Sequence, residues 1–315
     1  MALLTPAGEL ARDHLLQVHQ AGAEGNVACG LAHLGRPVRW LSRLGDDEFA
    51  PVITQFLAGR GVDVSHVVTD PARPTGLMVK TVRDGRTRVR YARTGSAASA
   101  LSRADLVPTA LADVSVCHLS GVTPALSESA SDLADELLLE RVLGPDVMMS
   151  FDVNHRPALW ADGMAPGRLR QLANAGDVVY VGLDEAEDLW GCRTPEQVRS
   201  VLPTPAILVV KDGGAAAYEF SKEGLITVPA LKADVVEVVG AGDAFAAGHL
   251  AGLLAGDDAV RRLRLGHVMA ACTLQSPLDL PPLPDAAQLR RWAALDDDGW
   301  QRLHVTADLL PGKEN

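Results

Sequence analysis

The chain has 315 residues, of which 47% are hydrophobic and 22% charged, values typical of one large α/β domain or two smaller ones. Its formal net charge of −11 argues against nucleic acid and anionic membrane surfaces as partners. We expect a cytoplasmic protein, because no leader pattern opens the chain and no apolar run approaches the length of a membrane span. The four cysteines are far apart, which supports neither a zinc site nor a disulfide framework.

The N-terminal region mixes short strands with helices. Residues 1–20 suggest one or two edge strands, and residues 22–35 form a helix with small side chains on one face. Gly22 and its small neighbours leave room for a ligand at the start of that helix. Asn26 in the first turn either hydrogen-bonds hydroxyl groups of a ligand or caps the helix, which is the common use of asparagine there.

The segment from Val67 to Arg93 has the alternating pattern of a β-hairpin, with its turn at Asp84-Gly85. We expect a small β-sheet lid, made of residues 1–20 and 67–93, on an α/β body made of residues 21–66 and 94–315. Strand alternation points Tyr91 and Arg93 to the same side. Such a pair recognises a carboxylate or hydroxyl groups, although an arginine on an edge strand is more commonly solubilising.

From about residue 101, helical and strand patterns alternate, which predicts βα units and a mostly parallel sheet covered by helices on both faces. The predicted strands are 114–119, 147–152, 178–181, 207–211 and 235–239, and the predicted helices are 102–112, 127–143, 166–175, 184–190, 195–201 and one that begins near 243. Asp152, Glu185, Lys211 and Asp243 all follow predicted strand ends. One crevice at the carboxyl edge of the sheet could therefore hold all four.

The stretch around Gly240-Ala241-Gly242-Asp243 predicts an anion site. Four valines before it indicate a buried strand, and a helix follows, so unpaired helical N–H groups face a ligand at the positive end of the dipole. Asp243 stands where a P-loop has lysine, and Phe245 replaces the third glycine of a dinucleotide fingerprint. We therefore interpret Asp243 as a general base that the helix terminus keeps ionised, beside N–H groups that receive charge from a transferring phosphoryl group. The alternative is that Asp243 only caps the helix.

Further stretches agree with this interpretation and follow one another in a family-like order. They are 22–28 with Leu34-Gly35, 91–97, 151–160, 181–187 with 209–214, and 240–243. Together they resemble the PfkB family of ribokinase-like carbohydrate kinases over nearly the whole chain. The stretch Phe151-Asp152-Val153-Asn154-His155-Arg156-Pro157-Ala158-Leu159-Trp160 is similar to the Asp-x-Asn-x-Arg-Pro-x-Leu-Trp element of the 2-keto-3-deoxygluconate kinases in that family.

The resemblance implies a ribokinase-like fold and ATP-dependent phosphorylation of the primary hydroxyl of a sugar or sugar acid. Its first candidate substrate is 2-keto-3-deoxygluconate, converted to the 6-phosphate, with ATP and Mg²⁺ as cofactors. The alternatives are a fructokinase, another sugar or nucleoside kinase of the family, or a non-catalytic homologue that binds sugar or nucleotide. A homodimer or higher homo-oligomer, paired through apolar lid faces, is also expected.

The resemblance also assigns roles to residues of this sequence. Asp243 is the base, and the backbone of Gly240, Ala241 and Gly242 stabilises the developing charge. The residues implied to hold the sugar are Gly22, Asn26, Tyr91, Arg93, Asn154, Arg156 and Asp243, with an arginine on the carboxylate of a sugar acid. The residues implied to lie along ATP are Lys211, Gly213, Gly240, Gly242 and His267, and Glu185 is linked to magnesium. His267 could equally be a core histidine.

Three departures from the family pattern stand out. Met1 falls inside the region of the opening strand, so we expect the first central strand to be absent. Glu237-Val238-Val239 replaces the usual Asp-Thr-Thr, which argues against a monovalent-cation site of the family type. Gly182 replaces the usual asparagine ahead of Glu185.

Overall fold

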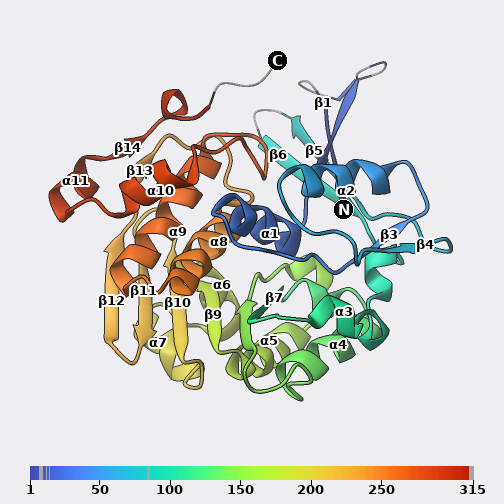
Figure 1. Ribbon diagram of the computed structural model, residues 1–315, viewed down its shortest axis with the longest axis horizontal. Helices are drawn as coiled ribbons and strands as arrows, with labels where there is room; N and C mark the ends of the chain where they lie inside the picture. The colour runs from blue at the N-terminus through green and yellow to red at the C-terminus, as the bar shows by residue number, and fades with distance from the viewer. Residues whose placement is uncertain (7–9, 12, 14, 84–85, 312–315) are drawn as a thin grey trace.

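Six strands form the central sheet of the computed structural model, in the order β12-β11-β10-β9-β8-β7 (Figure 1). Strands β7 to β10 run parallel, whereas β10, β11 and β12 pair antiparallel. The structure describes residues 1–6, 10–11, 13, 15–83 and 86–311. The strands of this sheet are β7 Val116–Ser120, β8 Met148–Asp152, β9 Val178–Gly182, β10 Ile207–Asp212, β11 Ala216–Ser221 and β12 Gly224–Pro229.

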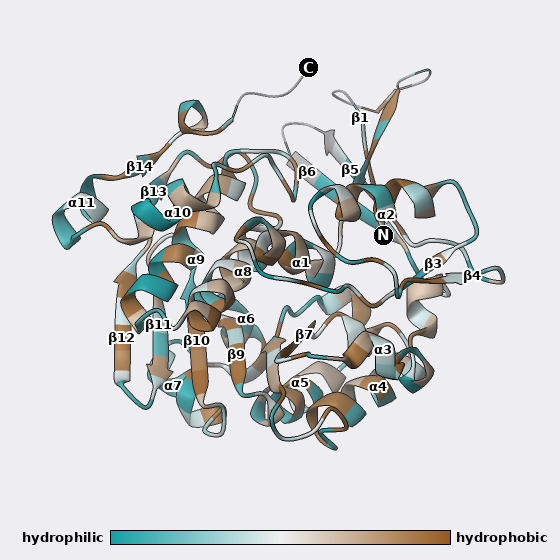
Figure 2. Cartoon of the chain, viewed as in Figure 1, coloured by the Kyte–Doolittle hydropathy of each residue, from teal (hydrophilic) through white to brown (hydrophobic). Residues whose placement is uncertain are grey.

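Helices cover both faces of this sheet, and alternate side chains of one strand pack against opposite layers. In β9, Val178 and Tyr180 belong to one core while Val179 and Val181 belong to the other. Figure 2 shows the matching hydrophobic colour along β10, which is buried between the layers. One layer holds α1 Ala23–His33, α8 Ala241–Ala255, α9 Ala259–Leu274 and α10 Ala286–Ala293, and the other holds α4 Glu128–Leu138, α5 Met164–Ala175, α6 Leu183–Trp190 and α7 Pro195–Val201.

A second sheet of four strands, in the order β2-β1-β5-β6, projects from the body beside the start of α1 (Figure 1). Its strands are β1 Ala2–Pro6, β2 Leu16–Gln20, β5 Leu77–Arg83 and β6 Arg86–Ala92. The predicted hairpin is therefore formed, while its turn, Asp84-Gly85, lies outside the described residues. Strand β4, Val68–Asp70, instead pairs with β3, Arg43–Gly45, in a separate two-stranded sheet near α2 Phe49–Gly59.

The predicted strand at 235–239 is wrong. After the short strand β13 Lys232–Ala233, which pairs with β14 His304–Val305, the chain runs as a surface loop. Val235, Val236 and Val238 are 61%, 59% and 65% exposed. β-Branched residues favour strands only where a neighbouring strand pairs with them, and the Val236 N–H donates instead to the Leu274 carbonyl at the end of α9.

Other parts of the chain also differ from the sequence prediction or were not predicted. The antiparallel strands β11 and β12 were not predicted, since their alternation is interrupted by glycines and charged residues. The predicted helix 102–112 is only a 3-10 turn, Arg103–Asp105, and a four-residue α3, Pro108–Leu111, because Pro108 disfavours helical geometry in the residue before it. Beyond Leu280 the chain forms α10 and α11 Asp297–Arg302, which bury Leu289 and Trp300. The remaining 3-10 helices are Ala97–Ala100, Thr123–Ala125, Pro157–Leu159 and Ala307–Leu309.

Helices α1 and α8 pack closely because small residues face each other. A Cβ atom added to Gly30 would lie 2.6 Å from the Cβ of Ala247, which is far inside contact distance. This close approach brings the first turns of the two helices together over the carboxyl edge of the sheet. Within the described ranges, no helix is long and apolar enough to cross a membrane.

Candidate active site

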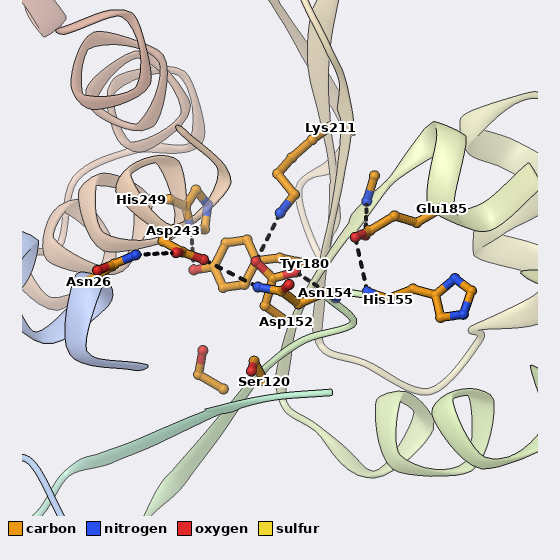
Figure 3. Close-up of polar contacts among 12 residues, drawn as sticks. Asn26, Ser120, Asp152, Asn154, His155, Tyr180, Glu185, Lys211, Asp243 and His249 are labelled. Atoms are coloured by element: carbon orange, nitrogen blue, oxygen red, sulfur yellow. Dashed lines mark hydrogen bonds and ion pairs between the residues drawn. The ribbon is translucent and has the colours of Figure 1, made fainter. Parts of the chain in front are cut away.

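One cleft of about 700 Å³ contains every residue that the sequence assigned to the site. Its walls are the carboxyl ends of β8, β9 and β10, the first turns of α1 and α8, and the lid strand β6. The assigned residues that line it are Gly22, Asn26, Tyr91, Arg93, Asn154, Arg156, Glu185, Lys211, Gly213, Gly240, Ala241, Gly242, Asp243 and His267. The side chains in Figure 3 come from elements far apart in the sequence and converge on this place.

Asp243 lies at the centre, held between two asparagine amides (Figure 3). The Nδ2 of Asn26 donates to one carboxylate oxygen at 2.8 Å, and the Nδ2 of Asn154 donates to the other at 3.2 Å. Asn154 follows β8 with a positive φ of 38°, a left-handed conformation that asparagine adopts more readily than most residues. The Oδ1 atoms of both asparagines are buried without a protein partner, so two acceptors beside the base are available to ligand hydroxyls.

The capping interpretation of Asp243 is not supported. Helix α8 begins at Ala241 with Gly240 as its N-cap, and no side chain caps it. Asp243 is the third helical residue, and the side chains that hydrogen-bond to it lie on α1 and after β8. Its carboxylate is therefore presented to the cleft rather than used by its own helix.

The expectation that the helix terminus keeps Asp243 fully ionised is wrong. Burial raises the pKa of Asp243 to about 7, which outweighs the hydrogen bond from Asn26 and the positive charge of Lys211. Asp152 also raises this pKa through charge repulsion. A carboxylate with a pKa near 7 is matched to proton transfer at neutral pH, so the shift favours a general base.

The start of α8 supplies N–H groups next to this base. Gly240 has a φ of 85°, and a Cβ there would lie 2.7 Å from the carbonyl oxygen of Asp279, so only glycine fits. The first N–H groups of a helix have no intrahelical partner, and we call those of residues 240–243 the anion hole. Of these, the Ala241 N–H donates to the Val238 carbonyl at 3.3 Å. The Nζ of Lys211 lies 3.5 Å from the position that a Cβ of Gly242 would take, which places a positive charge at the same spot.

Lys211 joins the acidic groups of the cleft. Its Nζ donates to Asp152 Oδ2 at 2.9 Å, where Asp152 ends β8 and is only 2% exposed. Burial alone would lower the pKa of Lys211, but the charges of Asp152 and Glu185 outweigh it and the pKa is raised. The ammonium is therefore charged at neutral pH. It lies beside the anion hole.

Glu185 is held by two backbone N–H groups, one at the start of its own helix and one after β8. Its Oε2 accepts from the Gly182 N–H at 2.9 Å and its Oε1 from the His155 N–H at 3.0 Å, so the carboxylate closes the first turn of α6 (Figure 3). Burial raises the pKa of Glu185 despite the nearby Lys211. Among the described residues, no group of three His, Cys, Asp or Glu side chains could hold a metal ion.

Arginines and a tyrosine form the wall on the lid side. The guanidinium of Arg93 stacks on the Tyr91 ring, 4.2 Å from its centroid, and burial lowers the pKa of Arg93. Arg156 is about half exposed and lies 3.9 Å from Glu185. Both arginines line the cleft, so the sequence-based pairing of Tyr91 with Arg93 is geometrically sound.

His267 is a core residue in its contacts, although it reaches the cleft wall. Its Nε2 lies 3.1 Å from the Val228 carbonyl, and its ring meets Phe245 edge-on. Burial lowers the pKa of His267 to about 4 even though the carbonyl contact raises it. The structure therefore favours the core alternative over contact with the nucleotide.

A buried polar chain lies beneath the cleft and was missed in the sequence. The Tyr180 hydroxyl and His249 Nδ1 are 2.8 Å apart, and His249 Nε2 is 3.0 Å from Glu219, which is also paired with Arg262. Burial lowers the pKa of His249, so a neutral ring donates to Glu219 and accepts from Tyr180. These hydrogen bonds join α8 to β9. No local sequence pattern predicts them, because the four residues lie on four different elements.

Glu24 is a second residue without an assigned role that the structure brings to the site. It lies in the first turn of α1, inside the Gly-Ala-Glu stretch, and its Oε1 accepts from Ser120 and Thr123 after β7. These bonds fix the start of α1, and hence Asn26, over the sheet. The resemblance of residues 22–28 to the family was the sequence signal that could have identified Glu24.

A buried carboxylate at a helix start, an adjacent anion hole and an ammonium group are the features that phosphoryl transfer to a hydroxyl group requires. Residues 2–286 match the family described as "pfkB family carbohydrate kinase". The chain is 37% identical over 281 residues to a 2-dehydro-3-deoxygluconokinase of Bacillus subtilis (strain 168), covering 85% of each chain. It is 35% identical over 288 residues to a 2-dehydro-3-deoxygluconokinase of Thermoproteus tenax, covering 89% of this chain and 87% of that one.

The fold comparison agrees with these relatives. The crystal structure of a PfkB protein from Polaromonas sp. JS666 matches with a TM-score of 0.82 and 34% identity, covering 92% of this chain and 96% of that one. The chain belongs to the pfkB family of carbohydrate kinases, and its fold is ribokinase-like. It is a carbohydrate kinase, and the family uses ATP as the phosphoryl donor.

Proposed function

We propose that the protein transfers the γ-phosphoryl group of ATP to the primary hydroxyl of a sugar acid. The first candidate is 2-keto-3-deoxygluconate, also called 2-dehydro-3-deoxygluconate, which becomes the 6-phosphate. The observation that carries the proposal is Asp243, buried between two asparagine amides beside the anion hole with a pKa of about 7. The names of the two curated relatives support the choice of substrate.

In this mechanism Asp243 accepts the proton of the primary hydroxyl as its oxygen attacks the γ-phosphorus. The bond from that phosphorus to the β,γ-bridging oxygen breaks, and ADP carries away the electron pair. The anion hole and the Lys211 ammonium stabilise the charge that spreads over the transferring group. Asn26 and Asn154 fix the carboxylate and offer their buried Oδ1 atoms to substrate hydroxyls.

Gly213 supports the proposed position of ATP along the cleft next to Lys211. It has a φ of 47° directly after β10, so the backbone can approach a ligand without a side chain between them. Magnesium, when bound, would neutralise phosphate charge. Since Mg²⁺ keeps several waters and binds largely through phosphates, Glu185 would hold it from the outer side.

Arg156 and Arg93 support an acidic substrate. Both line the cleft, and the charge of Arg156 lowers the pKa of both Asp243 and Arg93. Arg156 is 3.9 Å from Glu185 and Arg93 stacks on Tyr91, so neither guanidinium is held in a close ion pair with a buried carboxylate. An arginine offers a planar, bidentate site for a carboxylate, which a neutral sugar would leave unused. The lid strands carrying Tyr91 and Lys80 would then exclude water, which limits hydrolysis of ATP.

Purified protein with ATP, magnesium and a panel of sugars and sugar acids tests the proposal through ADP release. The expected result is a kcat/KM for 2-keto-3-deoxygluconate that exceeds that for fructose. A higher kcat/KM for fructose or a nucleoside would show that the proposed substrate is wrong. If no compound led to ADP release, the non-catalytic alternative would be favoured. The exposed Leu15, Leu16 and Val18 on the lid support the expected homodimer, which the molar mass in solution would test.

A further inference from the structure

Lys80, on the lid strand β5, is buried although it is a lysine. Only 6% of the residue is exposed. Its Nζ lies 2.9 Å from Glu237 Oε2 and donates to the Pro277 carbonyl at 3.0 Å. Lysine is almost never fully buried unless it is paired, so these oxygen atoms hold a desolvated ammonium group.

The two partners of Lys80 belong to the segments that meet at Gly240. Glu237 precedes the anion hole, and its Oε1 accepts from the Val238 N–H at 2.9 Å. Pro277 precedes Asp279, whose carbonyl oxygen packs against Gly240. The ammonium group therefore joins the two stretches of backbone that fix the first residue of the anion hole.

Charge balance around the ammonium supports this arrangement. Burial would raise the pKa of Glu237, but the hydrogen bond and the charge of Lys80 outweigh it and the pKa is lowered. Asp279 is buried nearby with one unpartnered oxygen, and burial raises its pKa to about 6 although Lys80 lowers it. Carboxylate and carbonyl oxygens around one monovalent cation are also the ligand set that potassium takes.

We propose that Lys80 is a positioning residue for phosphoryl transfer, its ammonium group standing where a free monovalent cation could otherwise bind and holding the anion hole in shape. Because Lys80 is carried by β5, the lid and the anion hole form one unit. It follows that the rate of this protein does not depend on potassium. The inference rests on the proposed function for its kinetic readout.

The experiment compares the full-length protein with Lys80→Ala and Lys80→Met, each in potassium, ammonium or choline chloride at equal ionic strength. The wild type is expected to have the same kcat in all three salts. Lys80→Ala should lose about 10–100-fold in kcat in choline, the range that mispositioned catalytic groups produce, with KM for the sugar acid little changed. Potassium or ammonium should restore much of the loss in Lys80→Ala, which leaves room for a cation, and not in Lys80→Met, which fills it.

Arg90→Ala is the matched control, since it removes an exposed cation from the same lid sheet and should behave as the wild type. Normal kcat of Lys80→Ala in choline would overturn the inference, and so would a loss that no cation relieves, including failure to fold in every salt. Potassium activation of the wild type would overturn it as well. If no sugar acid releases ADP, the melting temperature still decides: potassium should raise it in Lys80→Ala relative to choline and leave the wild type unchanged.

Discussion

The carboxylate of Asp243 lies 2.8 Å from the amide nitrogen of Asn26, a residue 217 positions earlier in the chain. That contact joins the first turns of α8 and α1 and is itself one of the forces that lower the pKa of the base. Both the place and the proton affinity of Asp243 therefore depend on how these two helices pack.

Asp243→Asn should abolish most turnover while leaving the fold intact. The amide cannot accept the hydroxyl proton, so kcat should fall about 10²–10⁴-fold, the usual contribution of a positioned base. The pKa of about 7 in the folded protein lies above the ordinary aspartate value of 3.8. The stability associated with Asp243 is therefore fully present below pH 3.8 and is lost as pH rises through 7. The substitution should thus raise the melting temperature more at about pH 8 than at about pH 4. Asp188→Asn, an exposed control, should change neither quantity, and near-normal turnover of Asp243→Asn would refute the mechanism.

Asn26→Ala should move the acid limb of the pH–rate profile upward. In the wild type kcat should rise with pH through about 7, because Asp243 must be ionised to accept a proton. A hydrogen bond to a charged group contributes about 1.5–3 kcal/mol, so its loss should shift the limb by about one to two pH units. The measurement is kcat against pH for both proteins. A lower plateau with an unmoved limb would mean that Asn26 acts on the substrate alone.

Lys211→Met should lower both activity and stability, because it removes a charge from the anion hole and leaves Asp152 buried without its partner. Breaking a buried pair from one side costs about 3–5 kcal/mol of unfolding free energy. Adding Asp152→Asn should recover much of the stability and little of the kcat, which we expect to remain about 10²–10³-fold low. Denaturant titration and kcat of the single and double variants check this. Recovery of both together would reduce Lys211 to a structural role.

Arg156→Ala should discriminate between acidic and neutral substrates. If Arg156 binds the carboxylate, KM for 2-keto-3-deoxygluconate should rise by the equivalent of about 2–4 kcal/mol, with a far smaller change for fructose. Arg93→Ala provides the matched comparison, because Arg93 is also in the cleft but stacks on Tyr91. The larger ratio between the two substrates identifies the carboxylate-binding arginine. Equal losses on both substrates in both variants would argue against an acidic substrate.

Tyr180→Phe should lower stability without changing chemistry. It removes the hydroxyl that bonds His249 and leaves a buried ring nitrogen unpaired, which costs about 1–3 kcal/mol. Because Tyr180 is fully buried and is not among the residues that line the cleft, kcat should stay close to that of the wild type. A large fall in kcat under conditions where the variant is fully folded would mean that this buried hydrogen-bond chain helps to position Asp243.

The sequence predicted the parts of the fold that are locally determined. The alternation of helices and parallel strands and the hairpin of the lid follow from patterns within short stretches. The set of residues expected in the cleft came largely from the resemblance to the family, and these residues do line one cleft. The prediction of a strand at 235–239 failed because the valines there are exposed, and composition does not reveal whether a neighbouring strand is present. The prediction that Asp243 is ionised failed for a related reason. The burial of its carboxylate, which raises the pKa, is set by α1 and by the turn after β8 and not by its own helix.

The close packing at Gly30 limits how this kinase can be stabilised by engineering. Replacing a helical glycine by alanine ordinarily gains about 0.4–1 kcal/mol by restricting the unfolded chain. At Gly30 the new methyl group would meet Ala247 and push α1 away from α8, drawing Asn26 from the base. The clash should cost more stability than the glycine replacement gains, so the melting temperature should fall at this position. Gly59, where an added Cβ meets nothing within 4 Å, is the safer choice.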